Sequence, residues 1–194
     1  MAAGTNIAAT TAAVTNRYVT STNMKVGAYT LANTTPVWQG GAFVTVTHTA
    51  NTGTDTLGTI DVVGVDIAGN VRSESIVPLN GTVATGLIPF RTITSITGVG
   101  WVINGGNDTI VVGVAAGAIV CGTSGTLYGY VVNITAAATV VFSDAVRTLF
   151  TLPVSLAVGD YDLGQGIDFV GYLRVATTST NDIVVVHSPT APGG

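Results

Sequence analysis

Short runs of β-branched and aromatic residues, separated by turns rich in glycine and asparagine, recur along most of the chain. Residues 41–50, GAFVTVTHTA, are typical, because apolar and polar side chains alternate there as they do in a half-buried strand. Only 8% of the 194 residues are charged, and several amphipathic helices would need more Glu, Lys and Arg on their solvent faces. Val and Thr suit a pleated surface, and 25 glycines supply the turns between many strands. The sequence therefore predicts an all-β protein.

The clearest local unit is a predicted hairpin in residues 57–79, LGTIDVVGVDIAGNVRSESIVPL. Its two strand-like runs flank a turn in which Asp66 can begin the reversal and Gly69 can adopt a positive φ. A further run, PFRTITSIT, leads to Trp101, and after an Asn- and Gly-rich turn the chain enters TIVVGV. Strands at this spacing predict a β-sandwich over residues 25–115.

A second domain is predicted after Ala115-Ala116-Gly117, a small and flexible segment that suits a boundary. Strand-like runs separated by turn residues resume there and predict a compact β-sandwich over residues 116–194, ending in an exposed Pro/Gly tail. Residues 1–24 are mostly Ala, Thr and Asn with no sustained period. We expect them to form an extended N-terminal arm that becomes ordered on a partner.

The charge balance excludes several classes of partner. A net charge of -4 with six scattered basic residues does not suit nucleic acid, because a phosphate-binding surface needs clustered Lys and Arg.

The longest apolar stretch, residues 110–121, is short of the roughly 20 residues that span a bilayer. Cys121 is the one cysteine, and the N-terminus does not resemble a secretory signal, so we expect synthesis in a cytoplasm. So few surface charges also suit a protein whose surface is buried against other subunits.

Residues able to carry catalysis are few. His48 and His187 are the two histidines, and either could act as a base for Cys121 only if the fold brought the two side chains together. Cys121 follows an apolar run and is expected to be a small buried side chain. Ser124 lacks the G-x-S-x-G motif of a nucleophile elbow and is expected to be a turn residue. We therefore expect no enzymatic activity and no cofactor.

The best candidates for a metal site are Asp160, Asp162 and Asp168, which lie among three glycines. Carboxylate oxygens on a turning chain suit Ca²⁺, but the spacing is not that of an EF-hand. Solvated or turn-capping aspartates are the simpler interpretation, so no metal is expected.

Aromatic residues offer two interpretations. A stacking platform for sugar rings could be built from six of them: Trp38, Trp101, Tyr128, Tyr130, Tyr161 and Tyr172. The alternative is that most are core or interface anchors. Alternation in TLYGYVVNI places Tyr128 and Tyr130 on one face, opposite to Leu127 and Val131. The residues that we expect at a subunit interface are Arg17, Tyr18, Trp38, Tyr128 and Tyr130.

Two stretches of the C-terminal half resemble a module of tailed-bacteriophage virion proteins. They are TLYGYVVNITAAATVVFSD and LFTLPVSLAVGDYDLGQGIDFVGYLRVATTSTNDIVVVHS. The resemblance implies a jelly-roll-like β-sandwich that associates as a trimer. Upstream, GTIDVVGVDIAGNVRSESIVPL and FRTITSITGVGWVINGGNDTIVVGV are similar to Ig-like β-sandwich regions of phage head-surface proteins.

The resemblance implies a capsid decoration, or cement, protein on the surface of a tailed-phage virion. No heptads, collagen-like repeats or long fibrous repeats are present, which favours attachment to a shell over an extended tail fibre. The expected partners are the major capsid protein and further copies of the chain in a homotrimer, with no nucleic acid and no membrane. The alternative is a receptor- or glycan-binding head-fibre or tail protein.

Overall fold

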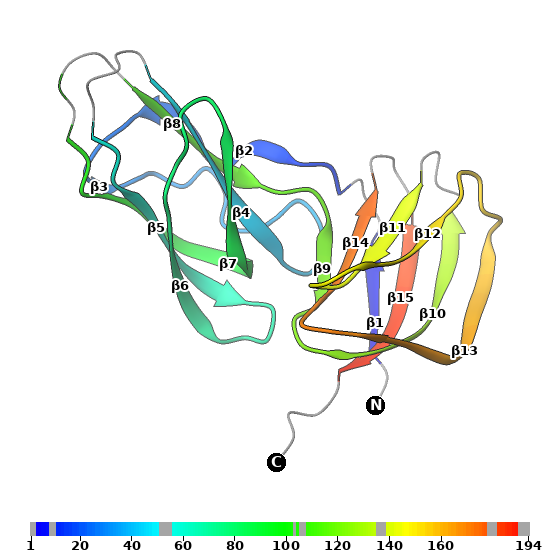
Figure 1. Cartoon of the computed structure of the whole chain (residues 1–194). Helices are drawn as coiled ribbons and strands as arrows, with labels where there is room; N and C mark the ends of the chain where they lie inside the picture. The colour runs from blue at the N-terminus through cyan, green and yellow to red at the C-terminus, as the bar shows by residue number, and fades with distance from the viewer. Residues whose placement is uncertain are drawn as a thin grey trace. The chain divides into compact units, whose positions relative to one another are not determined.

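The structure is a computed structural model that describes residues 3–7, 11–50, 56–102, 104, 108–134, 139–177 and 182–189. Within these ranges the regular secondary structure consists of β-strands, with no helix (Figure 1). The prediction of an all-β protein is confirmed. No helix in the described part of the chain is long and apolar enough to cross a membrane.

The chain divides into two compact units that are not consecutive in sequence. Unit 1 contains Met1–Ala12, Val37–Gly41 and Ala116–Gly194, and unit 2 contains Ala13–Pro36 and Ala42–Ala115. The chain therefore begins in unit 1, enters unit 2, returns to unit 1 for one short segment, and completes unit 2 before it ends in unit 1.

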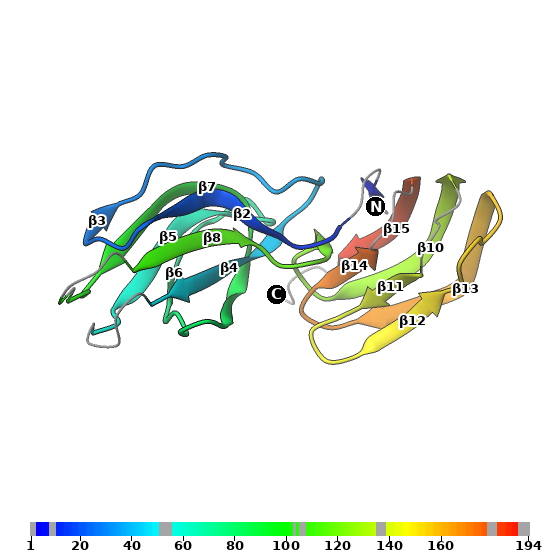
Figure 2. The ribbon, with the colours of Figure 1, turned by 90° about the horizontal axis from the view of Figure 1, so that it is seen from above.

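Unit 1 consists of two four-stranded antiparallel sheets, with strand orders β1-β15-β10-β13 and β12-β11-β14-β9. Its strands are β1 (Ala3–Ile7), β9 (Ala118–Cys121), β10 (Gly125–Ile134), β11 (Val140–Ser143), β12 (Thr148–Leu152), β13 (Gly159–Phe169), β14 (Leu173–Thr177) and β15 (Asp182–Pro189). Figure 2 shows the two sheets as two layers.

Aromatic side chains fill the space between these layers. The ring of Tyr130 on β10 lies 5.6 Å from that of Phe142 on β11 and 5.9 Å from that of Phe150 on β12. Phe142 and Phe150 stack with their centroids 4.6 Å apart. Phe142 is fully buried, and burying a side chain of this size contributes about 1.5–3 kcal/mol.

The prediction that residues 1–24 form an extended arm is wrong for those residues that the structure describes. β1 pairs with β15 over five residues, from Ala3 opposite His187 to Ile7 opposite Ile183. Thr11 is fully buried, and its hydroxyl donates to the carbonyl of Thr177 at 3.1 Å and accepts from the amide of Thr177 at 2.7 Å. Strand pairing on the edge of β15 uses backbone groups, which a sequence of Ala, Thr and Asn supplies without an apolar period.

Residues 14–23 of the predicted arm form β2 (Val14–Asn23), which belongs to unit 2 and pairs with β8. Tyr18 on β2 is fully buried. Residues 1, 2 and 8–10 of the predicted arm, and residues 190–194 of the predicted tail, lie outside the described residues.

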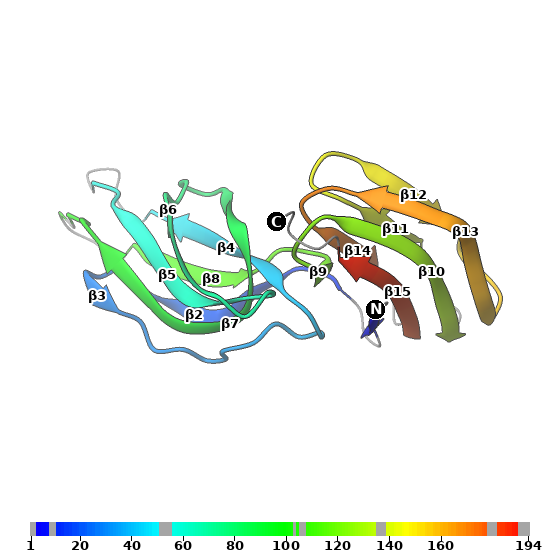
Figure 3. The ribbon, with the colours of Figure 1, turned by 90° about the horizontal axis from the view of Figure 1, so that it is seen from below.

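Unit 2 is one curved seven-stranded sheet with strand order β2-β8-β4-β7-β5-β6, in which β3 also pairs with β7 (Figure 3). Its further strands are β3 (Gly27–Ala28), β4 (Ala42–Thr49), β5 (Thr59–Asp66), β6 (Val71–Ile76), β7 (Val83–Val99) and β8 (Thr109–Val114).

The 17-residue strand β7 explains why the hydrogen bonds of unit 2 form a single sheet. Its first half pairs with β4 as far as Phe90, and from Phe90 onward it pairs with β5. One strand thus serves both halves of the unit, as strands do at the corners of sandwiches. The separate sheets of an Ig-like sandwich are therefore not confirmed.

The predicted hairpin is confirmed as β5 and β6. They pair from Ile60 opposite Ile76 to Val65 opposite Val71. The Oδ1 atom of Asp66 accepts hydrogen bonds from the amides of Ala68 and Asn70, at 2.9 Å each. Gly69 has a φ of 90°, which a residue with a side chain rarely adopts.

Candidate functional site

A surface hollow of about 300 Å³ lies over β10 and β13 of unit 1. We call it the Tyr128 hollow. Its lining comprises Tyr128, Gly129, Tyr130, Val131, Asp160, Tyr161, Asp162 and Val186. All but Val186 come from two neighbouring strands, and Val186 comes from β15, which pairs with β10 on its other side.

At the hollow, the register of β10 is irregular against both of its neighbours, β13 and β15. On β10, Leu127 is opposite His187 and Gly129 is opposite Val186, so Tyr128 is an extra residue relative to β15. An extra residue of this kind is a β-bulge, which redirects a side chain. A Cβ atom on Gly129 would lie 2.6 Å from the carbonyl oxygen of Tyr161, so the close approach of β10 to β13 requires glycine.

The bulge overturns the predicted alternation on β10. The side chain of Tyr128 is 40% exposed, whereas that of Tyr130 is 7% exposed and packs between the sheets with Leu127 and Val132. Tyr128 and Tyr130 therefore point to opposite faces, because one inserted residue shifts every following side chain by one position.

Two carboxylates flank the hollow. Asp160 is opposite Val131 and Asp162 is opposite Gly129, so both lie on the outer face of β13, two residues apart. Both are exposed, while Val131 is half-buried. This side of the hollow thus combines acceptor oxygens with an apolar floor.

The residue between the two aspartates supports the hollow from beneath. The ring of Tyr161 stacks on that of Tyr130, with centroids 5.0 Å apart and planes inclined by 12°. Its hydroxyl donates to the carbonyl of Ala157 at 2.7 Å. Burial, aided by the neighbouring Tyr161, raises the pKa of Tyr130 above its ordinary value, so this phenol stays neutral.

The three aspartates considered for Ca²⁺ do not gather at one point. Asp168 accepts a hydrogen bond from the hydroxyl of Thr126 at 2.8 Å, and Asp162 accepts one from the amide of Gly164 at 2.8 Å as a turn residue. In the described ranges, no group of three or more His, Cys, Asp or Glu side chains could hold a metal ion.

Most residues predicted at an interface are engaged within the chain. Tyr18 is fully buried, Trp38 is 6% exposed and Tyr130 is 7% exposed, so the prediction is wrong for these three. The guanidinium of Arg17 donates to the carbonyls of Thr35 at 2.7 Å and Pro36 at 3.2 Å. Tyr128 is the member of the set that is exposed.

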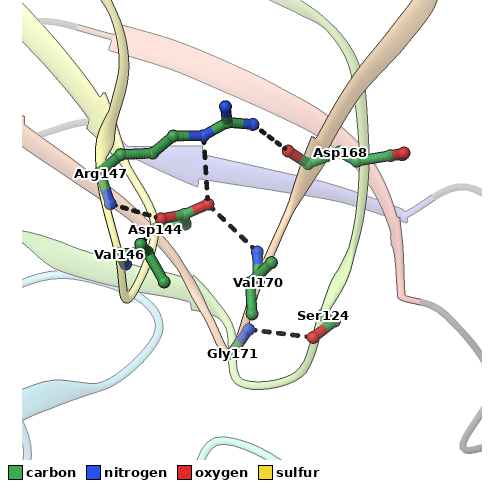
Figure 4. A network of polar contacts seen from close by, with 7 residues as sticks. All are labelled: Ser124, Asp144, Val146, Arg147, Asp168, Val170 and Gly171. Carbon is green, nitrogen blue, oxygen red and sulfur yellow. Dashed lines mark hydrogen bonds and ion pairs between the residues drawn. The ribbon is translucent and has the colours of Figure 1, made fainter.

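The side chains considered for catalysis also have local roles. The thiol of Cys121 is buried and donates to the carbonyl of Thr123 at 3.3 Å. Ser124 accepts a hydrogen bond from the amide of Gly171 at 3.0 Å (Figure 4). His187 is buried, and burial lowers the pKa of its imidazole.

His48 belongs to a buried pair that the sequence did not indicate. Its Nε2 atom lies 2.9 Å from Oδ2 of Asp108, and the two side chains are 2% and 0% exposed. The ring of Trp101 lies 6.2 Å from that of His48. The pair is therefore enclosed within unit 2.

A second buried carboxylate, that of Asp144, organises the turn between β11 and β12 (Figure 4). Its oxygens accept hydrogen bonds from the amides of Val146 at 2.7 Å, Arg147 at 2.8 Å and Val170 at 3.2 Å. Burial alone would raise the pKa of Asp144, but these three donors and the Arg147 guanidinium outweigh it and lower the pKa. The hydrogen bonds that Asp144 accepts therefore have a structural role at this turn.

Comparison of the chain with protein-family models, with curated proteins and with solved structures finds no match.

Proposed function

We propose that the chain is a structural, non-catalytic virion protein that binds the outside of a tailed-bacteriophage capsid and stabilises it. In this proposal the partners are the major capsid protein and two further copies of the chain in a homotrimer. The protein is made in the host cytoplasm, acts on the capsid surface and needs no cofactor.

The observation that carries the proposal is the order in which the strands of unit 1 pair. The first strand pairs with the last (β1 with β15), the second with the seventh (β9 with β14), the third with the sixth (β10 with β13) and the fourth with the fifth (β11 with β12). These four pairs form one long antiparallel ribbon. Two further pairings, β10 with β15 and β11 with β14, roll the ribbon into two sheets.

This connectivity supports the proposal of a jelly roll, an architecture that recurs in viral capsid and lectin domains. We assign unit 1 to it, with β1 as its first strand. Unit 2 then occupies the connection between the first and second strands of the roll. For unit 2 we propose a sandwich whose two layers are joined through β7, which differs from an Ig-like domain with separate sheets.

The surface gives further support. Large apolar side chains are strongly exposed in both units, including Leu87 at 86%, Val146 at 77% and Val71 at 76%. With only 8% charged residues, such a surface has little charge repulsion to prevent association. These properties suit a protein that is covered by neighbouring subunits on a shell.

The proposed mechanism is mass action. A protein that binds the assembled shell but not the dissociated subunits stabilises the assembled state in proportion to its occupancy. No bond is made or broken, and contact area between capsomers is sufficient.

Two measurements test the proposal. Light scattering after size exclusion is expected to give the mass of a trimer. Co-sedimentation with expanded shells of a tailed-phage major capsid protein is expected to saturate at a fixed ratio to capsomers. Leu87→Asp and Val146→Asp then identify the unit that contacts the shell, because a charge at a buried contact weakens binding. The proposal is refuted if the wild-type protein stays in the supernatant at every concentration while the shells sediment.

A further inference from the structure

We propose that the Tyr128 hollow is a binding site for a neutral saccharide. This site goes beyond attachment to a capsid and does not depend on it, because it needs only the fold of unit 1. It is carried by one exposed aromatic ring, two flanking carboxylates and a small apolar floor.

The aromatic ring supplies the stacking surface. Tyr128 is 40% exposed because the β-bulge turns it away from the core. The C–H face of a pyranose is apolar and packs on such a ring, while the phenol hydroxyl can exchange hydrogen bonds with the sugar. Val131 and Val186, both half-buried, extend the apolar floor beside the ring.

The carboxylates supply directional contacts. Asp160 and Asp162 lie on the same face, with their backbone positions opposite Val131 and Gly129. Sugar hydroxyl groups are donors that a carboxylate accepts, and hydrogen bonds to a charged group are stronger than those between neutral groups. The lining thus offers acceptor oxygens from Asp160 and Asp162 and apolar surface from Val131 and Val186, which match the polar hydroxyl groups and the apolar C–H face of a sugar ring.

Charge and size narrow the class of ligand. None of the described lining residues is basic, and the negative charge of Asp160 and Asp162 repels anions, so sialylated, sulphated and phosphorylated ligands are disfavoured. A volume of about 300 Å³ lies at the lower end of the range for small-molecule sites. One or two sugar rings fit this volume.

The site is preformed. Gly129 holds β10 close to β13, and the stack of Tyr130 on Tyr161 fixes the strand segments beneath the hollow. A rigid floor avoids the entropic cost of ordering the site when a ligand binds. Loop closure is therefore not required for binding.

Saturation-transfer NMR and calorimetry on the full chain test the proposal. The neutral probes are lactose, maltose, cellobiose and N,N′-diacetylchitobiose, and 3′-sialyllactose is the anionic comparator. We expect at least one neutral disaccharide to bind, with saturation of its ring protons, and 3′-sialyllactose to bind more weakly.

Variants locate the binding. Tyr128→Ala is expected to weaken it by roughly tenfold or more, whereas Tyr128→Phe keeps the ring and stays within about threefold of wild type. Asp160→Asn with Asp162→Asn is expected to weaken binding, and Asp168→Asn, a carboxylate on the same strand outside the lining, leaves it unchanged. Circular dichroism of each variant checks that the fold is retained.

Three results would overturn the proposal: no neutral probe binds, Tyr128→Ala binds as the wild type does, or 3′-sialyllactose binds most tightly. None of them bears on co-sedimentation with shells. Failure of the saccharide site and failure of the capsid proposal are therefore distinguishable.

Discussion

Replacing Asp144 by asparagine tests whether the turn network in unit 1 is as important as its geometry indicates. The side chain is 1% exposed, and its carboxylate accepts hydrogen bonds from the amides of Val146, Arg147 and Val170. Asparagine has almost the same shape but one acceptor oxygen and no charge. Its NH₂ group cannot accept from an amide.

The expected loss follows from the number of donors. Two amides keep an acceptor that has lost its charge, and one amide loses its acceptor. A hydrogen bond to a charged group contributes about 1.5–3 kcal/mol and one between neutral groups about 0.5–1.5 kcal/mol. We therefore expect Asp144→Asn to lower the free energy of unfolding by about 3–5 kcal/mol at neutral pH.

The pH dependence gives a second signature. Because the folded state lowers the pKa of Asp144, its contribution is fully present above the ordinary aspartate pKa of about 3.9. It is lost as the pH falls through the lower folded-state pKa. The difference in stability between wild type and Asp144→Asn is expected to be constant near neutral pH and to shrink in acid.

Urea titrations followed by circular dichroism at several pH values measure this difference. The matched control is Asp66→Asn, because Asp66 also accepts from two turn amides but through solvent-exposed hydrogen bonds. Water competes for these bonds, so Asp66→Asn is expected to lower the free energy of unfolding by about 1 kcal/mol or less. Equal losses for the two variants, or a difference for Asp144→Asn that grows in acid, would contradict the reasoning.

Three other perturbations test the fold. Deleting residues 1–12 removes the first strand of unit 1 and is expected to lower its melting temperature in a thermal scan; an unchanged melt would mean that β1 does not stabilise the roll. Phe142→Ala is expected to cost about 3–5 kcal/mol in a urea titration, and a loss under about 1 kcal/mol would contradict the packing of the aromatic cluster. Gly129→Ala is expected to lower the melting temperature because its Cβ atom would meet the Tyr161 carbonyl oxygen at 2.6 Å; a melt equal to that of the wild type would show that the bulge relaxes freely.

Local sequence patterns predicted the elements whose formation depends on residues close together in the sequence. The β5–β6 hairpin was visible in sequence because Asp66 and Gly69 encode its turn chemistry. The pairing of Ala3 with His187 was not visible. It joins residues from opposite ends of the chain through backbone groups, which carry no side-chain signal.

The Tyr128 hollow illustrates the same limit at the level of a site. Tyr128, Asp160 and Asp162 were singled out from sequence, but as parts of separate hypotheses, because only the register of β10 on β13 brings them together. One signal was available: a glycine within a strand often marks a bulge, and Gly129 marks this one. The assumption of strict alternation overlooked this bulge and placed Tyr130 on the same face as Tyr128.

The measurement that tests the central proposal most directly is the disruption temperature of the capsid as a function of the concentration of this protein. If the protein binds only the assembled shell, the disruption temperature rises with concentration until the sites are saturated. At 100 times the dissociation constant, each occupied site adds about 2.7 kcal/mol. A disruption temperature that does not change, although the protein is present at concentrations that saturate co-sedimentation, would contradict the account.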